Sequence, residues 1–226
     1  MKKKLIFVFV LSFIVILTGC SQDQAMNELS SSEELALFKF ESTEEEPVEM
    51  STGESLAFEV VAKDINGEKI DIKTNWLVDE KLATISNKKN DSVILSAKSP
   101  GNTELKAEYN GYIAKTKIKI KPNPNKNVYG YVTNGRGGPA IENATVRIED
   151  SNKRVKTNEN GFFEIGLKEN LEIDLIVEKE GMAKTRIQSL KITEGKVVEL
   201  EVPLRSEFNT ETWSSIPPEV SVEYTG

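Results

Sequence analysis

The chain has 226 residues, a formal net charge of −7, one cysteine and no histidine. Without histidine, the chain lacks the commonest general base, the commonest zinc ligand and every nucleophile that depends on a histidine partner. An acidic chain also lacks the basic surface that phosphate binding needs, so we expect no nucleic-acid partner. A single cysteine permits no internal disulfide, so the folded parts must be stabilised by packing alone.

The first twenty residues have the pattern of a bacterial export signal. Three lysines at positions 2–4 precede an apolar run over 5–17, which at 13 residues is too short to span a membrane core of ~30 Å as a helix. The segment 17–20 resembles the lipobox of bacterial lipoproteins. We therefore expect residues 1–19 to be a signal peptide and Cys20 to be the lipidated N-terminus, because a thiol is the best nucleophile for a diacylglyceryl group. The alternative is an ordinary secretory signal with an incidental cysteine.

Residues 20–33 are expected to be the lipidated cysteine and a flexible tether, because the segment is polar and has no periodicity. Without the lysines at positions 2–4 the net charge becomes −10, and −9 of it lies between Ser21 and Glu54, where ten acidic residues accompany one lysine. This segment is interpreted as a solvated entry to the first domain. The alternative is a segment that an anionic lipid leaflet repels outward.

Residues 34–121 alternate between apolar and polar positions, with turn residues between the runs, and this predicts an antiparallel β-sandwich. Asn110 and Gly111 predict a type I′ hairpin. The lysines at 115, 117 and 119 point away from the core and are interpreted as protecting an exposed strand from edge pairing. The predicted inward-facing residues are Leu56, Phe58, Val60, Ala62, Ile72, Thr74, Trp76, Val78, Val93, Leu95, Ala97, Ala114, Thr116, Ile118 and Ile120.

This region resembles the group 2 bacterial immunoglobulin-like domains over about 85 residues. The resemblance departs from the family pattern over 77–81. Trp76 stands where such a sandwich buries its large aromatic side chain, so we expect a core role rather than a sugar-stacking role. The matching pieces are the segments 51–55, 63–67, 75–76, 82–85 and 99–103.

Residues 122–127 contain two prolines and are expected to be a linker between domains. A second run of alternating segments fills 128–205 and predicts a second β-sandwich. Here Ile187 to Ile192 is expected to run along a sheet edge. The residues that mark the predicted strands are Val128, Gly130, Val132, Ala144, Val146, Ile148, Phe163, Ile165 and Leu167 (the last three on one face), Leu171, Ile173, Leu175, Val177, Val198, Leu200, Val202 and Leu204.

This second region resembles the carboxypeptidase regulatory-like domains, which have a prealbumin-like seven-strand sandwich. Met182 stands where the family commonly has an aromatic residue. The resemblance implies an accessory module without the peptidase itself, because the chain has no histidine to hold its zinc. The matching pieces are Gly130, Val132, the segments 139–141 and 143–146, Thr157, the segment 160–163, and 180–182.

Residues 206–226 form a C-terminal tail that resumes the alternation at Val220, Val222 and Tyr224. We expect the tail to add a strand to the second sandwich. The alternative is a docking segment around Trp213, which lies close to two prolines. Trp213 and Tyr224 are therefore the two candidate binding residues.

Two other groups of residues are polar enough to suggest a metal site. Asp64, Asn66, Glu68 and Asp71 have a spacing that could hold calcium, but the closing glutamate of a calcium loop is missing and residues 66–67 also form a hairpin-turn pair. Residues 158–161 are likewise interpreted as a turn rather than as a calcium site. No lysine stands in a motif for an internal isopeptide bond, and no carboxylate pair has a motif for acid/base catalysis. We expect no catalytic residue, metal or cofactor.

The sequence thus predicts an all-β protein with two tandem antiparallel β-sandwiches after a lipoprotein signal peptide. The predicted function is a non-enzymatic, membrane-anchored binding or spacer module on the extracytoplasmic face of a bacterial envelope. Its expected partners are the membrane, through lipid on Cys20, and cell-wall glycan or an envelope protein. The alternative is an accessory subunit of an envelope enzyme or transporter. A solute-binding protein is disfavoured, since it needs a two-lobed α/β cleft.

Overall fold

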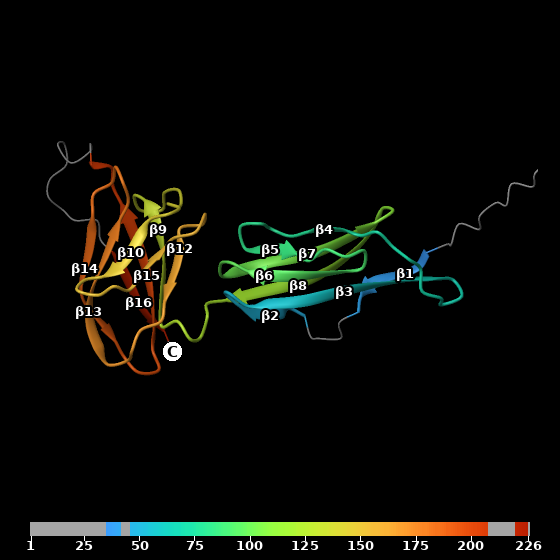
Figure 1. Ribbon diagram of the computed structural model, residues 1–226, viewed down its shortest axis with the longest axis horizontal. Helices are drawn as coiled ribbons and strands as arrows, with labels where there is room; N and C mark the ends of the chain where they lie inside the picture. Colours follow the sequence, from blue (N-terminus) through green and yellow to red (C-terminus); the bar gives the residue numbers. More distant parts are fainter. Residues whose placement is uncertain (1–34, 42–45, 208–219, 226) are drawn as a thin grey trace, which may run out of the picture. The chain divides into compact units, whose positions relative to one another are not determined.

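The computed structural model of the chain describes residues 35–41, 46–207 and 220–225. All of them belong to one compact unit. The described residues fold into four sheets of four strands each, which form two β-sandwiches (Figure 1). The all-β class with two tandem sandwiches is therefore confirmed.

The first sandwich pairs a sheet of order β1-β3-β6-β5 with a sheet of order β2-β8-β7-β4. All of its strand pairs are antiparallel except that between β2 and β8, which is parallel. The strands are β1 (Leu35–Phe40), β2 (Val48–Ser51), β3 (Ser55–Asp64), β4 (Asn75–Leu77), β5 (Ala83–Ser86), β6 (Ser92–Ala97), β7 (Gly101–Tyr109) and β8 (Tyr112–Lys121).

The core of the first sandwich contains most of the side chains that alternation placed inward, although Leu56 and Val78 are only partly buried, and Val48, Met50 and Ile70 join it from outside the predicted set. Trp76 is only 3% exposed and packs edge-on against Phe40, with ring centroids 5.9 Å apart. Phe40 also meets Phe58 at 6.2 Å in a T-shaped contact. Such aromatic pairs stabilise a core beyond the area that they bury, and the predicted core role of Trp76 is confirmed. The fully buried residues here include Val60, Ala62, Ala83, Leu95, Leu105 and Ala107.

The hairpin between β7 and β8 confirms the turn prediction. Asn110 and Gly111 have φ angles of +46° and +86°, the two positive values that a type I′ turn requires. The interpretation of the lysine row is wrong, however. β8 lies between β2 and β7 and is not an edge strand, so Lys115, Lys117 and Lys119 have no edge to protect. They lie on the outer face of the sheet, where Lys115 pairs with Glu104 at 3.9 Å.

The second sandwich pairs a sheet of order β11-β10-β13-β14 with one of order β12-β9-β15-β16. β15 runs parallel to β9 and antiparallel to β16. β14 lies at a sheet edge, as predicted. The strands are β9 (Val128–Asn134), β10 (Thr145–Ile148), β11 (Arg154–Lys156), β12 (Phe162–Ile165), β13 (Leu171–Glu178), β14 (Thr185–Ile192), β15 (Val197–Leu204) and β16 (Ser221–Thr225).

The parallel pair β9–β15 depends on a glycine. A Cβ atom at Gly130 would lie 2.3 Å from the carbonyl oxygen of Leu200 on β15, closer than real Cβ contacts allow.

Thr157, between β11 and β12, fixes the local backbone by hydrogen bonds. Its buried hydroxyl donates to the Ile141 carbonyl at 2.7 Å and accepts from the Ala144 N–H at 2.8 Å. Gly130 and Thr157 both belong to the motif behind the second resemblance, and both act in backbone packing.

Candidate functional site

The structure describes only one of the three residues selected as sites. Cys20 and Trp213 lie outside the described residues. Tyr224 lies on β16 and is 50% exposed, so its side chain is accessible, and its role in binding stays a prediction. β16 pairs with β15 over five residues, which confirms the expectation that the tail adds a strand to the second sandwich.

The group around Asp64 forms a turn. One oxygen of Asp64 accepts the backbone N–H groups of Asn66 and Glu68 at 2.9 and 2.8 Å, and the other accepts the Asn66 amide at 3.1 Å. Such local bonds are typical of an Asx turn. Within the part of the chain that the structure describes, no group of three or more Asp, Glu, Cys or His side chains could hold a metal ion.

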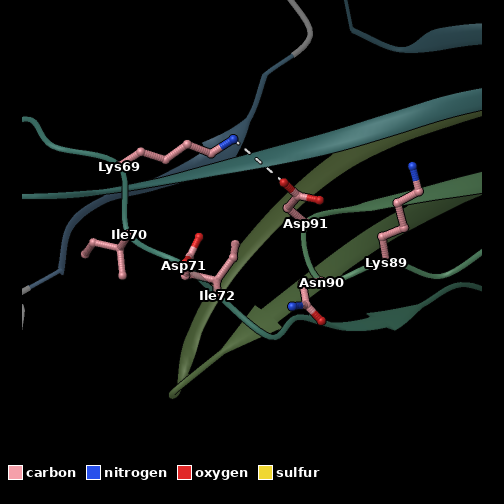
Figure 2. A pocket seen from close by; sticks show the side chains of 7 residues that line it. All are labelled: Lys69, Ile70, Asp71, Ile72, Lys89, Asn90 and Asp91. Atoms are coloured by element: carbon pink, nitrogen blue, oxygen red, sulfur yellow. Dashed lines mark ion pairs between the residues drawn. The ribbon is translucent and has the colours of Figure 1, made fainter.

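A shallow cleft of about 430 Å³ lies between the segment before β4 and the loop before β6 (Figure 2). Lys69 crosses its rim and lies 3.7 Å from Asp91 and 3.6 Å from Glu59. Ile70 and Ile72 are each 5% exposed and form the apolar floor. The cleft has both charge signs and is open, so its geometry favours a small polar group over an apolar ligand. Its lining residues are Lys69, Ile70, Asp71, Ile72, Lys89, Asn90 and Asp91.

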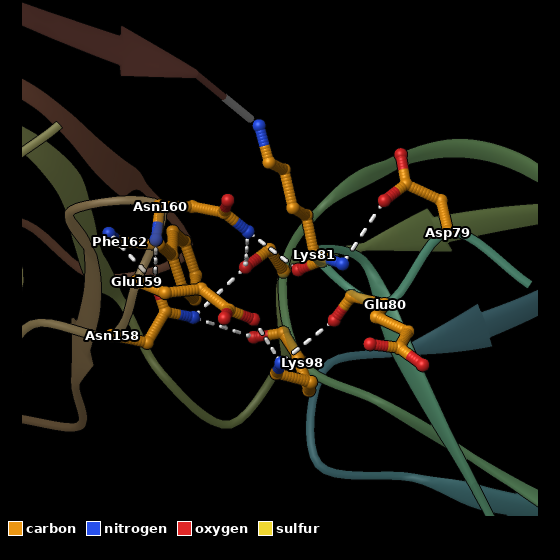
Figure 3. A network of polar contacts seen from close by, with 9 residues as sticks. Asp79, Glu80, Lys81, Lys98, Asn158, Glu159, Asn160 and Phe162 are labelled. Atoms are coloured by element: carbon orange, nitrogen blue, oxygen red, sulfur yellow. Dashed lines mark hydrogen bonds and ion pairs between the residues drawn. The ribbon is translucent and has the colours of Figure 1, made fainter. Parts of the chain in front are cut away.

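The most extensive polar network joins residues far apart in sequence (Figure 3). The turn 158–161 before β12 contacts loops of the first sandwich inside the same compact unit. The Asn158 amide donates to the Ser99 hydroxyl at 2.9 Å, and the Asn160 amide donates to the same hydroxyl at 2.9 Å. Asn160 also bonds to the carbonyl oxygen of Lys81. Ser99 is 1% exposed, so its hydroxyl is a buried acceptor for two amide donors.

The same turn is held rigid from within. The carboxamide oxygen of Asn158 accepts the backbone N–H groups of Asn160 and Phe162 at 3.0 and 3.1 Å. Asn158 therefore uses its oxygen to fix its own turn and its nitrogen to bind Ser99. Because it joins the turn to Ser99, Asn158 is the centre of the network.

Three further contacts lie around this network. Lys98 forms an ion pair with Glu159 and donates to the carbonyl oxygen of Glu80 at 2.7 Å. The Thr52 hydroxyl donates to a carboxylate oxygen of Glu164 at 2.6 Å. Thr52 is 1% exposed, whereas the Lys98 and Glu159 side chains are 28% and 44% exposed. The buried hydroxyl contacts matter more for stability, because partly exposed ion pairs contribute little.

An acidic and basic cluster lies on the outer face of the β10-β13-β14 sheet. The Ser189 backbone N–H donates to Asp174 at 2.9 Å, and Arg186 donates to Asp174 at 2.7 and 3.1 Å. The Ser189 bond, followed by the Arg186 bond, lowers the pKa of Asp174 below its ordinary value. Arg186 also pairs with Glu149. The cluster fixes an irregular edge, since Ser189 has a φ of +54°.

The outer face of the β12-β9-β15-β16 sheet carries aromatic rings beside carboxylates. The rings of Tyr131 and Phe162 lie 5.4 Å apart, and those of Tyr129 and Phe162 lie 6.3 Å apart. The Tyr129 hydroxyl donates to Glu199 at 2.8 Å. Burial, and then the hydrogen bond to Glu199 and the charges of Glu199 and Glu223, raise the pKa of Tyr129 well above its ordinary value.

Sequence reasoning found the turn 158–161 but missed its function, and it missed Thr52, Ser99 and Glu164 as contact residues. Ser99 stands in the Ser-Pro-Gly turn before β7, where its residue type signals only a turn. Nothing in the local pattern indicates that its hydroxyl is buried against residues about 60 positions away.

Residues 127–205 match the family model of the carboxypeptidase regulatory-like domain. The match covers 79 of the 226 residues and confirms the resemblance of the second sandwich. No curated protein matches the chain. Within the described residues, no helix is long and apolar enough to cross a membrane.

Several solved structures have detectable similarity to the chain. Domains 4 and 5 of the S-layer protein SbsC are 22% identical, with a TM-score of 0.34, over 38% of this chain and 51% of that one. The match thus spans about half of that structure. The adhesin InvE of Yersinia pseudotuberculosis is 13% identical, with a TM-score of 0.33, over 70% of this chain and 60% of that one. The integrin-binding protein invasin is 11% identical, with a TM-score of 0.31, over 72% and 39%.

Proposed function

We propose that the protein is a non-enzymatic lipoprotein of a bacterial envelope, anchored through Cys20, whose two β-sandwiches act as a binding or spacer module. The observation that carries the proposal is the pairing of a lipobox-like segment at 17–20 with two sandwiches that each have a continuous apolar core. The first sandwich is assigned to the group 2 bacterial immunoglobulin-like domains, a proposal supported by its residue pattern and by the buried Trp76.

The polar side chains at Asp64 and in the turn 158–161 support the non-enzymatic part of the proposal. Asp64 is engaged in its own turn, and Asn158 and Asn160 are engaged with Ser99. These polar groups therefore have structural roles. For a spacer, the network at Ser99 offers a physical means of limiting the motion of one sandwich against the other, because it adds buried hydrogen bonds to the covalent linker.

The anchor is tested by Cys20→Ala, with Ser21→Ala as the matched control. Removing the thiol removes the site of lipid attachment, so the variant is expected in the soluble extracytoplasmic fraction, while Ser21→Ala stays with the membrane after a high-salt wash. Detergent phase partitioning measures the difference. A Cys20→Ala variant that remained membrane-bound to the same extent would contradict lipid anchoring.

The binding partner is tested with the soluble Cys20→Ala chain as bait, offered either purified cell wall or detergent-solubilised membrane. Saturable retention on purified wall supports a glycan-associated module. A single co-eluting protein supports the second candidate function, an accessory subunit of an envelope enzyme or transporter. The family match over 127–205 favours that second candidate, because the name of the family describes a regulatory-like domain.

A further inference from the structure

The outer edge of β15 is filled by a strand that lies outside the family match. The match ends at residue 205, just after β15 ends at Leu204. β16 follows 16 residues later and pairs antiparallel with β15, from Val197↔Thr225 to Glu201↔Ser221. The sheet β12-β9-β15 thus ends in a backbone edge to which the chain adds its own fourth strand.

β16 is held less firmly than the strand it covers. On β15 the inward-facing Val198, Leu200 and Val202 are fully buried. On β16, Val222 is only partly buried against the core, and Tyr224 is 50% exposed. Stabilisation scales with the apolar area removed from water, so β16 gains far less from side-chain packing than β15 does. Its attachment depends mainly on the backbone ladder.

The charges across this edge oppose the pairing. Glu199 on β15 lies directly opposite Glu223 on β16, and like charges directly opposite each other destabilise an antiparallel pair. Directly paired residues project to the same face of a sheet, so both carboxylates lie on the outer face, where the Tyr129 hydroxyl donates to Glu199 at 2.8 Å. Two residues further along β15, Glu201 faces Ser221, whose hydroxyl donates to it at 3.4 Å. The edge of β15 therefore presents two carboxylates, and β16 carries no lysine or arginine opposite either of them.

We propose that the outer edge of β15 is a strand-acceptor site, that β16 is its resident occupant, and that its partner is an extended segment alternating apolar and basic residues. Apolar side chains of the partner take the place of Val222, and lysine or arginine side chains lie opposite Glu199 and Glu201. Backbone bonds to a sheet edge supply affinity and alternate side chains supply specificity in this recognition mode. The inference goes beyond the proposed function, because it concerns the second sandwich whether or not the protein carries a lipid anchor.

A partner must displace a strand that is covalently linked. A linked segment competes at an effective concentration on the order of millimolar, so only a segment that pairs better than β16 succeeds. Reversing the charge opposite Glu199 turns a repulsive cross-strand pair into an attractive one. A segment with basic residues at these positions therefore pairs with β15 more favourably than β16 does, as displacement of β16 requires.

The test uses a labelled peptide with the sequence of residues 218–226 carrying Ser221→Lys and Glu223→Lys, with the unaltered peptide as control. Three forms of the full chain in a Cys20→Ala background are compared by fluorescence anisotropy. They are the parent, a Val222→Asp variant that weakens β16, and a Val197→Cys, Thr225→Cys variant whose oxidised form locks β16 to β15. The basic peptide is expected to bind Val222→Asp at least tenfold tighter than the parent, and to bind the oxidised lock not at all until it is reduced.

The unaltered peptide is expected to bind several-fold more weakly than the basic one, and raised salt should shrink that difference. Equal binding to the locked and weakened forms, or no binding to the weakened form, would overturn the proposal. Should Val222→Asp fail to fold, hydrogen exchange on a Glu223→Lys chain decides the matter. Amides 221–225 are expected to exchange several-fold more slowly than in the parent, and unchanged exchange would refute the charge argument.

Discussion

Trp76 offers a sharp test of how the first core is stabilised. Its side chain is 3% exposed, yet its indole N–H has no hydrogen-bond partner among the described residues. Trp76→Phe removes two carbons and this N–H. The lost carbons cost about 1.6 kcal/mol at ~0.8 kcal/mol per buried methylene, and the cavity that they leave raises this to about 2 kcal/mol. Removing an unsatisfied buried donor returns about 1–3 kcal/mol. The two effects nearly cancel, so we expect a change in unfolding free energy within about 1 kcal/mol of zero.

The matched control is Val60→Ala, which also removes two carbons from a fully buried site of the same core but removes no polar group. It should destabilise by about 2 kcal/mol or more, because a cavity adds to the transfer cost. Urea unfolding followed by circular dichroism measures both variants, and the transition that Val60→Ala shifts is that of the first sandwich. If Trp76→Phe destabilises that transition as much as Val60→Ala does, the reasoning about the unpaired N–H fails.

Three other substitutions test the rest of the structure. Gly130→Ala places a Cβ atom 2.3 Å from a carbonyl oxygen of β15, so calorimetry should show a loss near the upper end of the ~1–3 kcal/mol typical of overpacking; an unchanged melting temperature would contradict the close approach. The lowered folded-state pKa of Asp174 contributes stability above its ordinary value of 3.8, which is lost as pH falls through the lowered pKa. Melting temperatures should therefore fall more steeply below about pH 4 in the parent than in Asp174→Asn, and parallel curves would refute this. Asn158→Ala removes its bond to the Ser99 hydroxyl, which keeps Asn160 as a partner, and its bonds to the N–H groups of Asn160 and Phe162. At about 0.5–1.5 kcal/mol per bond it should cost about 1–3 kcal/mol, whereas the same change at the exposed Asn102 on β7 should cost less than about 0.5 kcal/mol.

Alternation in the sequence predicted the faces of the strands well, because side chains on a strand must alternate between core and solvent. The inward sets around Leu95 and Ile118 are buried, as are Phe58, Val60 and Ala62, and the Asn110 turn has the expected backbone. Alternation says nothing about which strand lies beside which. The lysines of β8 were therefore assigned to an edge, although β8 is a central strand, and neither parallel pair was foreseen.

The contacts at Ser99 could not be predicted for a related reason. Each turn that contributes to them has an ordinary local explanation: Asn158 closes an Asx turn, and Ser99 precedes a proline. Their meeting depends on how two loops about 60 residues apart approach each other. No periodicity records such an approach, so the residues of the network became visible only in the structure.

The two sides of β15 show why the second sandwich favours loss of one particular strand. On one side, Gly130 lets β9 approach so closely that no larger residue fits, and Val128 and Val132 of β9 are fully buried. On the other side, β16 is only partly packed and sets Glu223 against Glu199. Proteins open first where few apolar contacts are lost. Opening on this side exposes a backbone edge beside two carboxylates and leaves the core of the sandwich in place, as an acceptor for a basic strand requires.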